Sequence, residues 1–133
     1  AVINFRIIPG ETISTVTNRV NQIINDERIT IKTGAFVSEP SKVSSTSSFG
    51  YRTLNKTISE IYPTALVAPY LVVGATDSRH FNAISDNIYR FSAIKINKEN
   101  IKSFHGFNER LPISDYENSI RFYHQLIKNS TSK

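Results

Sequence analysis

The chain has 133 residues, no cysteine and a formal net charge of +5. This length suits one modest core or two small units, and the absence of cysteine excludes disulfides and thiolate metal sites. The lysines and arginines are scattered, so we expect no nucleic-acid partner. We also expect no membrane span, because no apolar run is long enough to cross a bilayer. No basic-then-apolar leader opens the chain, which leaves its compartment open.

The first 35 residues predict a strand, a helix and a second strand. Residues 2–8 alternate between two faces, and Pro9-Gly10 ends this first strand. Apolar residues then recur at helical spacing over residues 13–24, with Thr12 as the N-cap. Residues 29–32 alternate again and predict the second strand. A chain that begins with Ala in mid-strand is expected to be a segment of a longer protein.

A serine-rich stretch follows, and it is the best boundary candidate in the chain. Residues 38–48 hold six serines, one threonine and one proline. This composition is typical of a linker or a surface loop. We therefore predict that one unit ends near Ser38 and that the next begins near Phe49.

The remaining residues predict alternating helices and strands. Residues 49–61 form a helical pattern that ends before Pro63, and 65–73 is nearly all apolar, as in a strand buried on both faces. A short helix is predicted over 79–84 and a strand over 88–93. Ser114-x-x-Glu117 is a capping box at the start of the last helix, whose apolar side is Ile120, Leu126 and Ile127. Helices that alternate with buried strands indicate an α/β layered fold.

His105 is the candidate metal ligand, within the loop sequence 103–111. Functional residues concentrate in loops, and an imidazole can bind zinc while neighbouring polar groups, here Asn108 and Glu109, orient it. An ordinary loop histidine remains the alternative. The chain has three histidines and no cysteine. A zinc centre would therefore need ligands from other segments.

Two further segments could bind substrate. Arg6 lies on the predicted open face of the first strand, where a guanidinium can hold a carboxylate, although a solvated strand face is the alternative. The polar turn after the 65–73 strand offers close backbone approach at Gly74, a hydroxyl at Thr76 and charges at Asp77 and Arg79. Ligands gather beyond the carboxyl ends of strands in such sheets. The alternative is an ordinary turn with a surface ion pair.

Four segments, residues 4–10, 67–80, 85–91 and 105–110, resemble the co-catalytic zinc exopeptidases and amidohydrolases in order and spacing. This family includes aminoacylase, carboxypeptidase S and succinyl-diaminopimelate desuccinylase, and the likeness is greatest to the carboxypeptidase S branch. The only visible departure is Ala75, where relatives usually have glycine.

The resemblance implies that the chain is a C-terminal fragment of such an enzyme. Residues 1–35 would be the strand-helix-strand end of an inserted α+β lid domain. Residues 36–48 would be the loop that crosses back, and residues 49–133 would be the C-terminal part of the α/β zinc catalytic domain. Such lids often dimerise, so a homo-oligomer is expected, together with the missing N-terminal half as a partner.

The resemblance also implies roles for the candidate residues. His105 would be the last ligand of a pair of zinc ions, with Asn108 and Glu109 as its supporting neighbours. Arg6 would clamp the free carboxylate of the substrate. The residues that would line the substrate pocket are Gly74, Thr76, Asp77 and Arg79.

The parent protein is therefore expected to be a di-zinc metallohydrolase. It would cleave the amide next to a free carboxylate in a small peptide or an N-acyl amino acid. We expect the chain alone to be inactive, because one histidine cannot organise two zinc ions. A non-catalytic ligand-binding or dimerisation module is the alternative, and an unrelated small α/β protein is a third reading.

Overall fold

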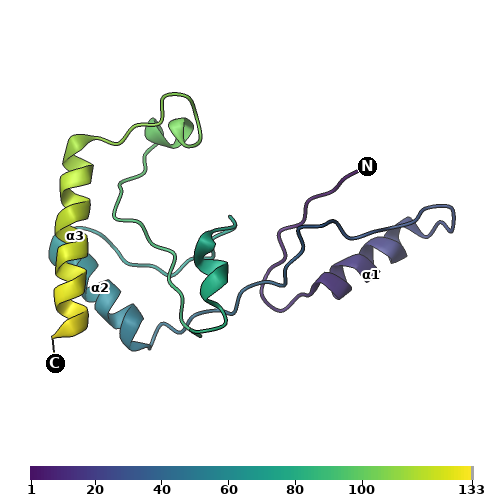
Figure 1. Ribbon diagram of the computed structural model, residues 1–133, viewed down its shortest axis with the longest axis horizontal. Helices are drawn as coiled ribbons and strands as arrows, with labels where there is room; N and C mark the ends of the chain where they lie inside the picture. Colours follow the sequence, from purple (N-terminus) through teal and green to yellow (C-terminus); the bar gives the residue numbers. More distant parts are fainter. Residues whose placement is uncertain (133) are drawn as a thin grey trace. The chain divides into compact units, whose positions relative to one another are not determined.

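The computed structural model describes residues 1–132 and is built from helices joined by extended segments (Figure 1). In chain order the elements are α1 (Ile13–Ile24), α2 (Phe49–Ile61), η1 (Asp77–Phe81), η2 (Asn100–Ser103) and α3 (Ile113–Thr131). The elements η1 and η2 are short 3-10 turns of helix. No strand occurs among these 132 residues.

The chain divides into two compact units. Unit 1 joins residues 1–44 with Val72–Ile88, and unit 2 joins Ser45–Leu71 with the residues from Tyr89 onward. The chain therefore passes between the units three times. The division into residues 1–35, 36–48 and 49–133 stays a prediction.

Unit 1 contains α1, whose start and end follow the local sequence. The Glu11 N–H donates to the Ile8 carbonyl at 3.1 Å, and Gly10 has a φ of 95°, which suits the third position of a tight turn. Thr12 then caps the helix by accepting from the Thr15 N–H at 3.0 Å. Asn25 ends it in the left-handed conformation. The predicted helix and its N-cap are confirmed.

The N-terminus of α1 also receives an acidic side chain from the serine-rich stretch. The Ile13 N–H donates to a carboxylate oxygen of Glu39 at 3.1 Å. The first amides of a helix have no partner within it, and a negative charge is favourable there. This contact ties residue 39 to α1 across 26 residues of sequence.

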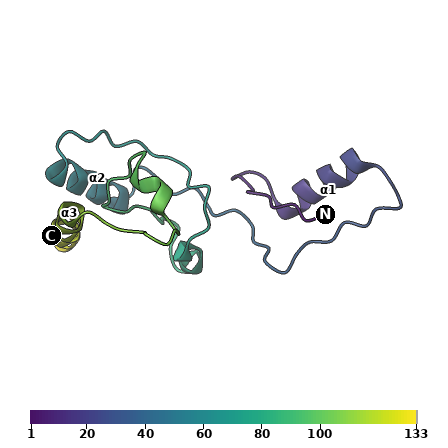
Figure 2. The ribbon, with the colours of Figure 1, turned by 90° about the horizontal axis from the view of Figure 1, so that it is seen from above.

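Unit 2 is organised by α2 and α3, which pack against each other (Figures 1 and 2). Three buried apolar side chains form its core, from α2, α3 and the extended segment between them: Ile58, Phe122 and Ala93. Phe122 is 0% exposed. Its ring centroid lies 5.0 Å from that of Phe91 and 6.3 Å from that of Tyr62. Aromatic pairs at these distances add to the stabilisation from burial.

Polar contacts surround this core and fix how the extended segment lies against the helices. The Ala93 carbonyl accepts from the Tyr62 hydroxyl and from the Ser119 hydroxyl, each at 3.0 Å. The side-chain amide of Asn129 donates to the Thr57 hydroxyl at 2.9 Å and to Glu60 at 2.8 Å. Thr57 is fully buried, so its hydroxyl needs a hydrogen-bond partner, and Asn129 is one.

The four predicted strands, residues 2–8, 29–32, 65–73 and 88–93, are extended chain in the structure, and the α/β fold class is not confirmed. The burial expected for 65–73 is wrong for this chain, since Leu66 is 98% exposed and Val73 70% exposed. The reason is that a strand forms its hydrogen bonds with a neighbouring strand. The described residues supply no such neighbour to these segments.

The predicted capping box at the start of the last helix is wrong. α3 begins at Ile113, and its N-cap is Pro112, which makes no side-chain capping bond. Instead, the Asp115 and Tyr116 N–H groups donate to the Pro112 carbonyl at 3.0 and 3.1 Å. Proline suits a helix start because its φ is already fixed near the helical value.

The apolar side of α3 also differs from the prediction. Leu126 packs on the core as expected, but Ile120 and Ile127 are exposed. The face that meets the core and its flanking segments contains Ser119, Phe122, Leu126 and Asn129. These positions are three or four residues apart, as neighbours on one helix face must be. The face with Ile120 and Ile127 has no apolar cover in the described chain.

The serine-rich stretch is anchored at its end. The Ser44 hydroxyl accepts from the Ile88 N–H at 2.8 Å and donates to the Ile88 carbonyl at 2.9 Å. The Tyr89 hydroxyl bonds the Ser45 carbonyl and the Ser48 hydroxyl. Ser48 in turn caps α2. The predicted loop is therefore held by side-chain hydrogen bonds and does not act as a free linker there.

An exposed ion pair lies beside this anchor in unit 1. The Lys42 amine and the Asp86 carboxylate are 2.6 Å apart. The hydrogen bond from Lys42 lowers the pKa of Asp86 below its ordinary value, and the charge of Lys42 adds to this effect. Both side chains are 76% exposed, so water and salt screen the pair and it adds little to stability.

Replacement of Phe122 by alanine should destabilise unit 2 by about 3–5 kcal/mol, because it opens a cavity at the centre of the small core. Urea unfolding followed by circular dichroism measures this. Tyr116→Ala, on an exposed position of the same helix, is the control and should cost about 0.5 kcal/mol or less. Equal losses in both variants would contradict the central role of Phe122.

Unit 2 should lose stability in alkaline solution through Tyr62. Partial burial raises the pKa of its phenol above the ordinary value of 10.0, with smaller contributions from Asp115 and Tyr123. A raised pKa means that this stabilisation is complete below the unfolded value and is lost as pH rises through the folded value. Ionisation also removes the proton donated to the Ala93 carbonyl.

The measurement is the urea midpoint between about pH 9 and pH 11, which brackets the ordinary tyrosine pKa. Tyr62→Phe should lose about 1 kcal/mol at neutral pH and show a flatter alkaline decline. Tyr70→Phe, at an exposed tyrosine, is the control and should keep the decline of the parent chain. If both variants decline alike, Tyr62 is not the group responsible.

Candidate functional site

His105 lies at the reversal of a tight loop between η2 and α3. Its φ is 59°, the left-handed region that residues with a Cβ seldom adopt. The following amide, the Gly106 N–H, donates to the Ser103 carbonyl at 2.9 Å, and the Glu109 N–H donates to the Gly106 carbonyl at 3.3 Å. Two successive turns thus place His105 at the outer bend of residues 103–109.

Glycine is required next to His105 for a steric reason. A Cβ at Gly106 would lie 3.1 Å from the Ser103 carbonyl oxygen. That separation is shorter than ordinary van der Waals contact, which begins near 3.4 Å. The His-Gly pair is therefore the sequence signal of this bend, although the sequence analysis used only the histidine.

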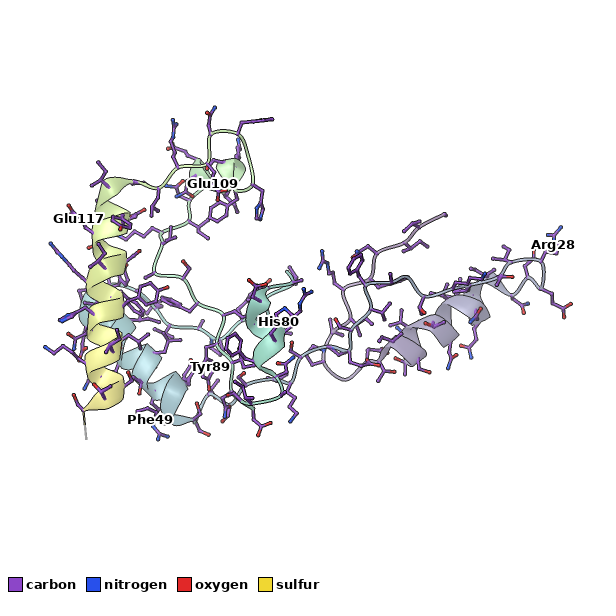
Figure 3. The ribbon with its side chains drawn as sticks, in the orientation of Figure 1. Arg28, Phe49, His80, Tyr89, Glu109 and Glu117 are labelled. Carbon is purple, nitrogen blue, oxygen red and sulfur yellow. The ribbon has the colours of Figure 1, made fainter. Side chains whose placement is uncertain are left out.

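Glu109 and Asn108, the two residues predicted to support His105, differ in their contacts. A carboxylate oxygen of Glu109 accepts from the backbone N–H of His105 at 3.1 Å, and Figure 3 shows Glu109 in the loop that leads into α3. Asn108 is exposed, and no hydrogen bond from its side chain is seen within residues 1–132. In the described chain the imidazole of His105 is exposed, and its ring nitrogens have no hydrogen-bond partner.

The polar turn predicted to line a substrate pocket becomes the start of η1 in unit 1. Thr76 precedes η1 in an extended conformation, and its hydroxyl lies 2.5 Å from that of Ser78. Asp77 is the first residue of η1. The short helix predicted over 79–84 therefore begins two residues earlier and ends at Phe81. Nothing lies within 4 Å of a Cβ built on Gly74, so the backbone there is open to close approach.

Arg79 does not pair with Asp77, which removes the surface ion pair weighed as an alternative. Its guanidinium Nε donates to the Nε2 of His80 at 3.3 Å. Both side chains are exposed on η1. Arg6 is exposed in the extended first segment of the same unit. The side chains of Arg6, Arg79 and His80, all in unit 1, are thus accessible to an anionic ligand.

The candidate residues fall in both units. Unit 1 holds the residues predicted to bind substrate, namely Arg6, Gly74, Thr76, Asp77 and Arg79. Unit 2 holds His105, Asn108 and Glu109. The contacts described above for each of these two groups therefore lie within a single unit.

The residues fit a zinc centre only as a source of one ligand. His105 offers an exposed ring nitrogen, the donor type that zinc prefers. Among residues 1–132 no group of three histidine, cysteine, aspartate or glutamate side chains could hold a metal ion. The other two histidines, His80 on η1 and His124 on α3, are also exposed and belong to no such group. A zinc site that includes His105 must therefore draw its other ligands from outside these residues.

Several known proteins align with this chain over nearly all of its length. It is 38% identical over 130 residues to "Probable carboxypeptidase S-like 2" of Dictyostelium discoideum. It is 40% identical over 132 residues to "N-fatty-acyl-amino acid synthase/hydrolase PM20D1" of Xenopus tropicalis, and 36% identical over 132 residues to the protein of that name in Homo sapiens. Each alignment covers 98% of this chain. No family model and no solved structure matches the chain.

The chain is similar over nearly all of its length to carboxypeptidase S-like proteins. The predicted resemblance is thereby confirmed. The chain spans only about a quarter of the length of these relatives, with 25% of the first and 26% of the human protein aligned. Most residues of these relatives thus have no counterpart in this chain.

No helix in the described part of this carboxypeptidase S-like chain is both long enough and apolar enough to cross a bilayer. The longest helix, α3, has 19 residues and carries charged side chains along its length.

Substitution of Gly106 by alanine should disturb the His105 loop, because the new methyl group meets the Ser103 carbonyl. We expect the loop to lose about 1 kcal/mol of local stability, the lower end for overpacking. The measurement is the change in backbone amide shifts over residues 103–109 by NMR.

Gly74→Ala is the matched control, since its methyl group would meet open space. It should shift only the amides beside it. Unperturbed amides over 103–109 in Gly106→Ala would contradict the steric account of this glycine.

Proposed function

We propose that this chain is the C-terminal part of a di-zinc hydrolase that cleaves an amide next to a free carboxylate. The substrate class would be N-acyl amino acids or small peptides. The observation that carries this proposal is the similarity across 98% of the chain to a carboxypeptidase S-like protein and to N-fatty-acyl-amino acid synthase/hydrolases. The printed names of both kinds of relative describe chemistry at an amide bond beside an amino acid.

His105 would supply one zinc ligand in the parent enzyme. Its support is the exposed imidazole at an outer bend, with no ring hydrogen bond in the described chain. Bound zinc lowers the pKa of a water molecule and polarises a carbonyl group. The remaining ligands would come from residues beyond those described.

Unit 1 would bind the substrate. Arg6 would hold its free carboxylate, because a guanidinium presents two parallel donors that match the two carboxylate oxygens. Gly74 and Thr76 would offer the backbone and hydroxyl of the pocket turn, and Asp77 and Arg79 would offer its charges. The exposure of these residues supports the assignment, since a binding group must be accessible in the absence of substrate.

The finer fold prediction also depends on the parent protein. We propose that residues 65–73 and 88–93 become strands of an α/β catalytic domain when neighbouring strands pair with them. The exposed apolar side chains of residues 65–73 support this, because a long exposed apolar segment is unfavourable unless another surface covers it. Residues 1–35 would likewise complete the lid domain, and the same exposed surface would favour self-association of the isolated chain.

The test compares the isolated chain with a protein of the length of its relatives, both assayed on an N-acyl amino acid with zinc. The chain alone should be inactive. In the longer protein, His105→Ala should lower kcat/KM by more than about 100-fold, because loss of a direct ligand exceeds the effect of outer partners. Arg6→Ala should raise KM by about tenfold, because it removes a charged hydrogen bond to the substrate and such a bond strengthens binding by about that factor.

Two controls accompany this assay. His124→Ala removes an exposed histidine of α3 that no proposal assigns to the site, and it should keep full activity. Arg6→Lys should not restore KM, since an ammonium lacks the paired donors of a guanidinium. Zinc-dependent turnover by the isolated chain, or full activity of His105→Ala, would overturn the proposal.

A further inference from the structure

The left-handed backbone at His105 needs a cause. In this conformation the Cβ crowds the neighbouring carbonyl, so a histidine stays there only when its surroundings hold it. Two contacts within residues 103–109 can do so. The Gly106 N–H donates to the Ser103 carbonyl at 2.9 Å and closes a turn around His105, and the His105 N–H donates to the Glu109 carboxylate at 3.1 Å. Of these, only the second involves a side chain that can be changed without altering the turn itself.

Glu109 closes the loop through both its backbone and its side chain. Its backbone N–H donates to the Gly106 carbonyl at 3.3 Å, and its side chain accepts from the His105 N–H. The amide of His105 points toward Glu109 because the chain reverses at His105. A carboxylate is a strong acceptor for a backbone N–H, since such charge-assisted hydrogen bonds exceed neutral ones.

This contact differs from the role expected of a neighbour of a metal-binding histidine. Such neighbours usually accept a hydrogen bond from the second ring nitrogen and so select the tautomer. Here the Glu109 carboxylate is on the backbone amide, and the imidazole is exposed with no ring partner in the described chain.

We propose that Glu109 is a positioning residue that holds the His105 backbone in its left-handed conformation and so presents the imidazole away from the loop. This inference deepens the proposed function, on which its importance for activity rests. Glu109 would act through the main chain of His105, leaving both ring nitrogens for other partners. Neither zinc nor substrate would touch Glu109.

The experiment uses the 133-residue chain and reads the His105 amide directly by NMR. Glu109→Ala removes the acceptor, so the His105 amide proton should shift upfield and exchange about five- to tenfold faster, as expected for loss of one hydrogen bond. Glu109→Gln keeps an oxygen acceptor at the same length, and it should restore most of the shift and protection. The resonances of Ala93 in the core should be unchanged in both variants, which shows that unit 2 remains folded.

Glu117→Ala is the matched control, because Glu117 is an exposed glutamate on α3 (Figure 3). It should leave the His105 amide unchanged. An unchanged amide in Glu109→Ala would overturn the proposal. A change confined to the imidazole nitrogen shifts would also overturn it, because Glu109 would then act on the ring.

The same variants in a protein of the length of the relatives separate this inference from the function on which it rests. Glu109→Ala should lower kcat more than it raises KM, and Glu109→Gln should recover most of the loss. If His105→Ala retains activity while the amide result holds, the proposed function fails and the backbone role of Glu109 stands. If His105→Ala abolishes activity but Glu109→Ala leaves the amide in place, the backbone role fails.

Discussion

A helix satisfies its backbone hydrogen bonds within its own segment, whereas a strand needs a neighbour, and this difference governs the structure of the chain. α1, α2 and α3 form because each requires only local contacts and a cap. The segments 65–73 and 88–93 fit the pattern of strands, yet neither is a strand in the structure. Residues 65–73 are largely exposed, whereas 88–93 includes the buried Ala93. The described residues give these segments no neighbouring strand, and the chain spans about a quarter of the length of its relatives.

The small core of unit 2 follows from the same constraint. With no sheet to cover, α2 and α3 pack on each other and enclose Phe122, while the segment around Ala93 lies against them through its carbonyl. Sequence periodicity located both helices but not their contact face. Ile120 and Ile127 fit an apolar stripe, but they lie on the face of α3 that α2 does not cover. Periodicity alone does not distinguish an apolar face that stays exposed from the face that packs within the chain.

Local chemistry was more predictable than tertiary packing. Thr12 was identified as an N-cap from its residue type and place, and it caps α1 as expected. The capping box at Ser114 failed because Pro112 already sets the helical φ and starts the helix earlier. The family was likewise recognisable from the sequence, because its motifs lie in order along the chain. The division into a lid piece and a catalytic piece stays a prediction.

The candidate site shows how far residue type alone could lead. The sequence placed His105 in a loop and Glu109 beside it, and it assigned the carboxylate to the imidazole by analogy with ordinary metal sites. The backbone conformation of His105 changes that assignment, because a φ of 59° turns its N–H toward Glu109. A periodicity pattern carries no information about such a φ, and only the His105-Gly106 pair hints at it. The carboxylate therefore stabilises the bend, and the orientation of the ring is left to groups that approach it from outside the loop.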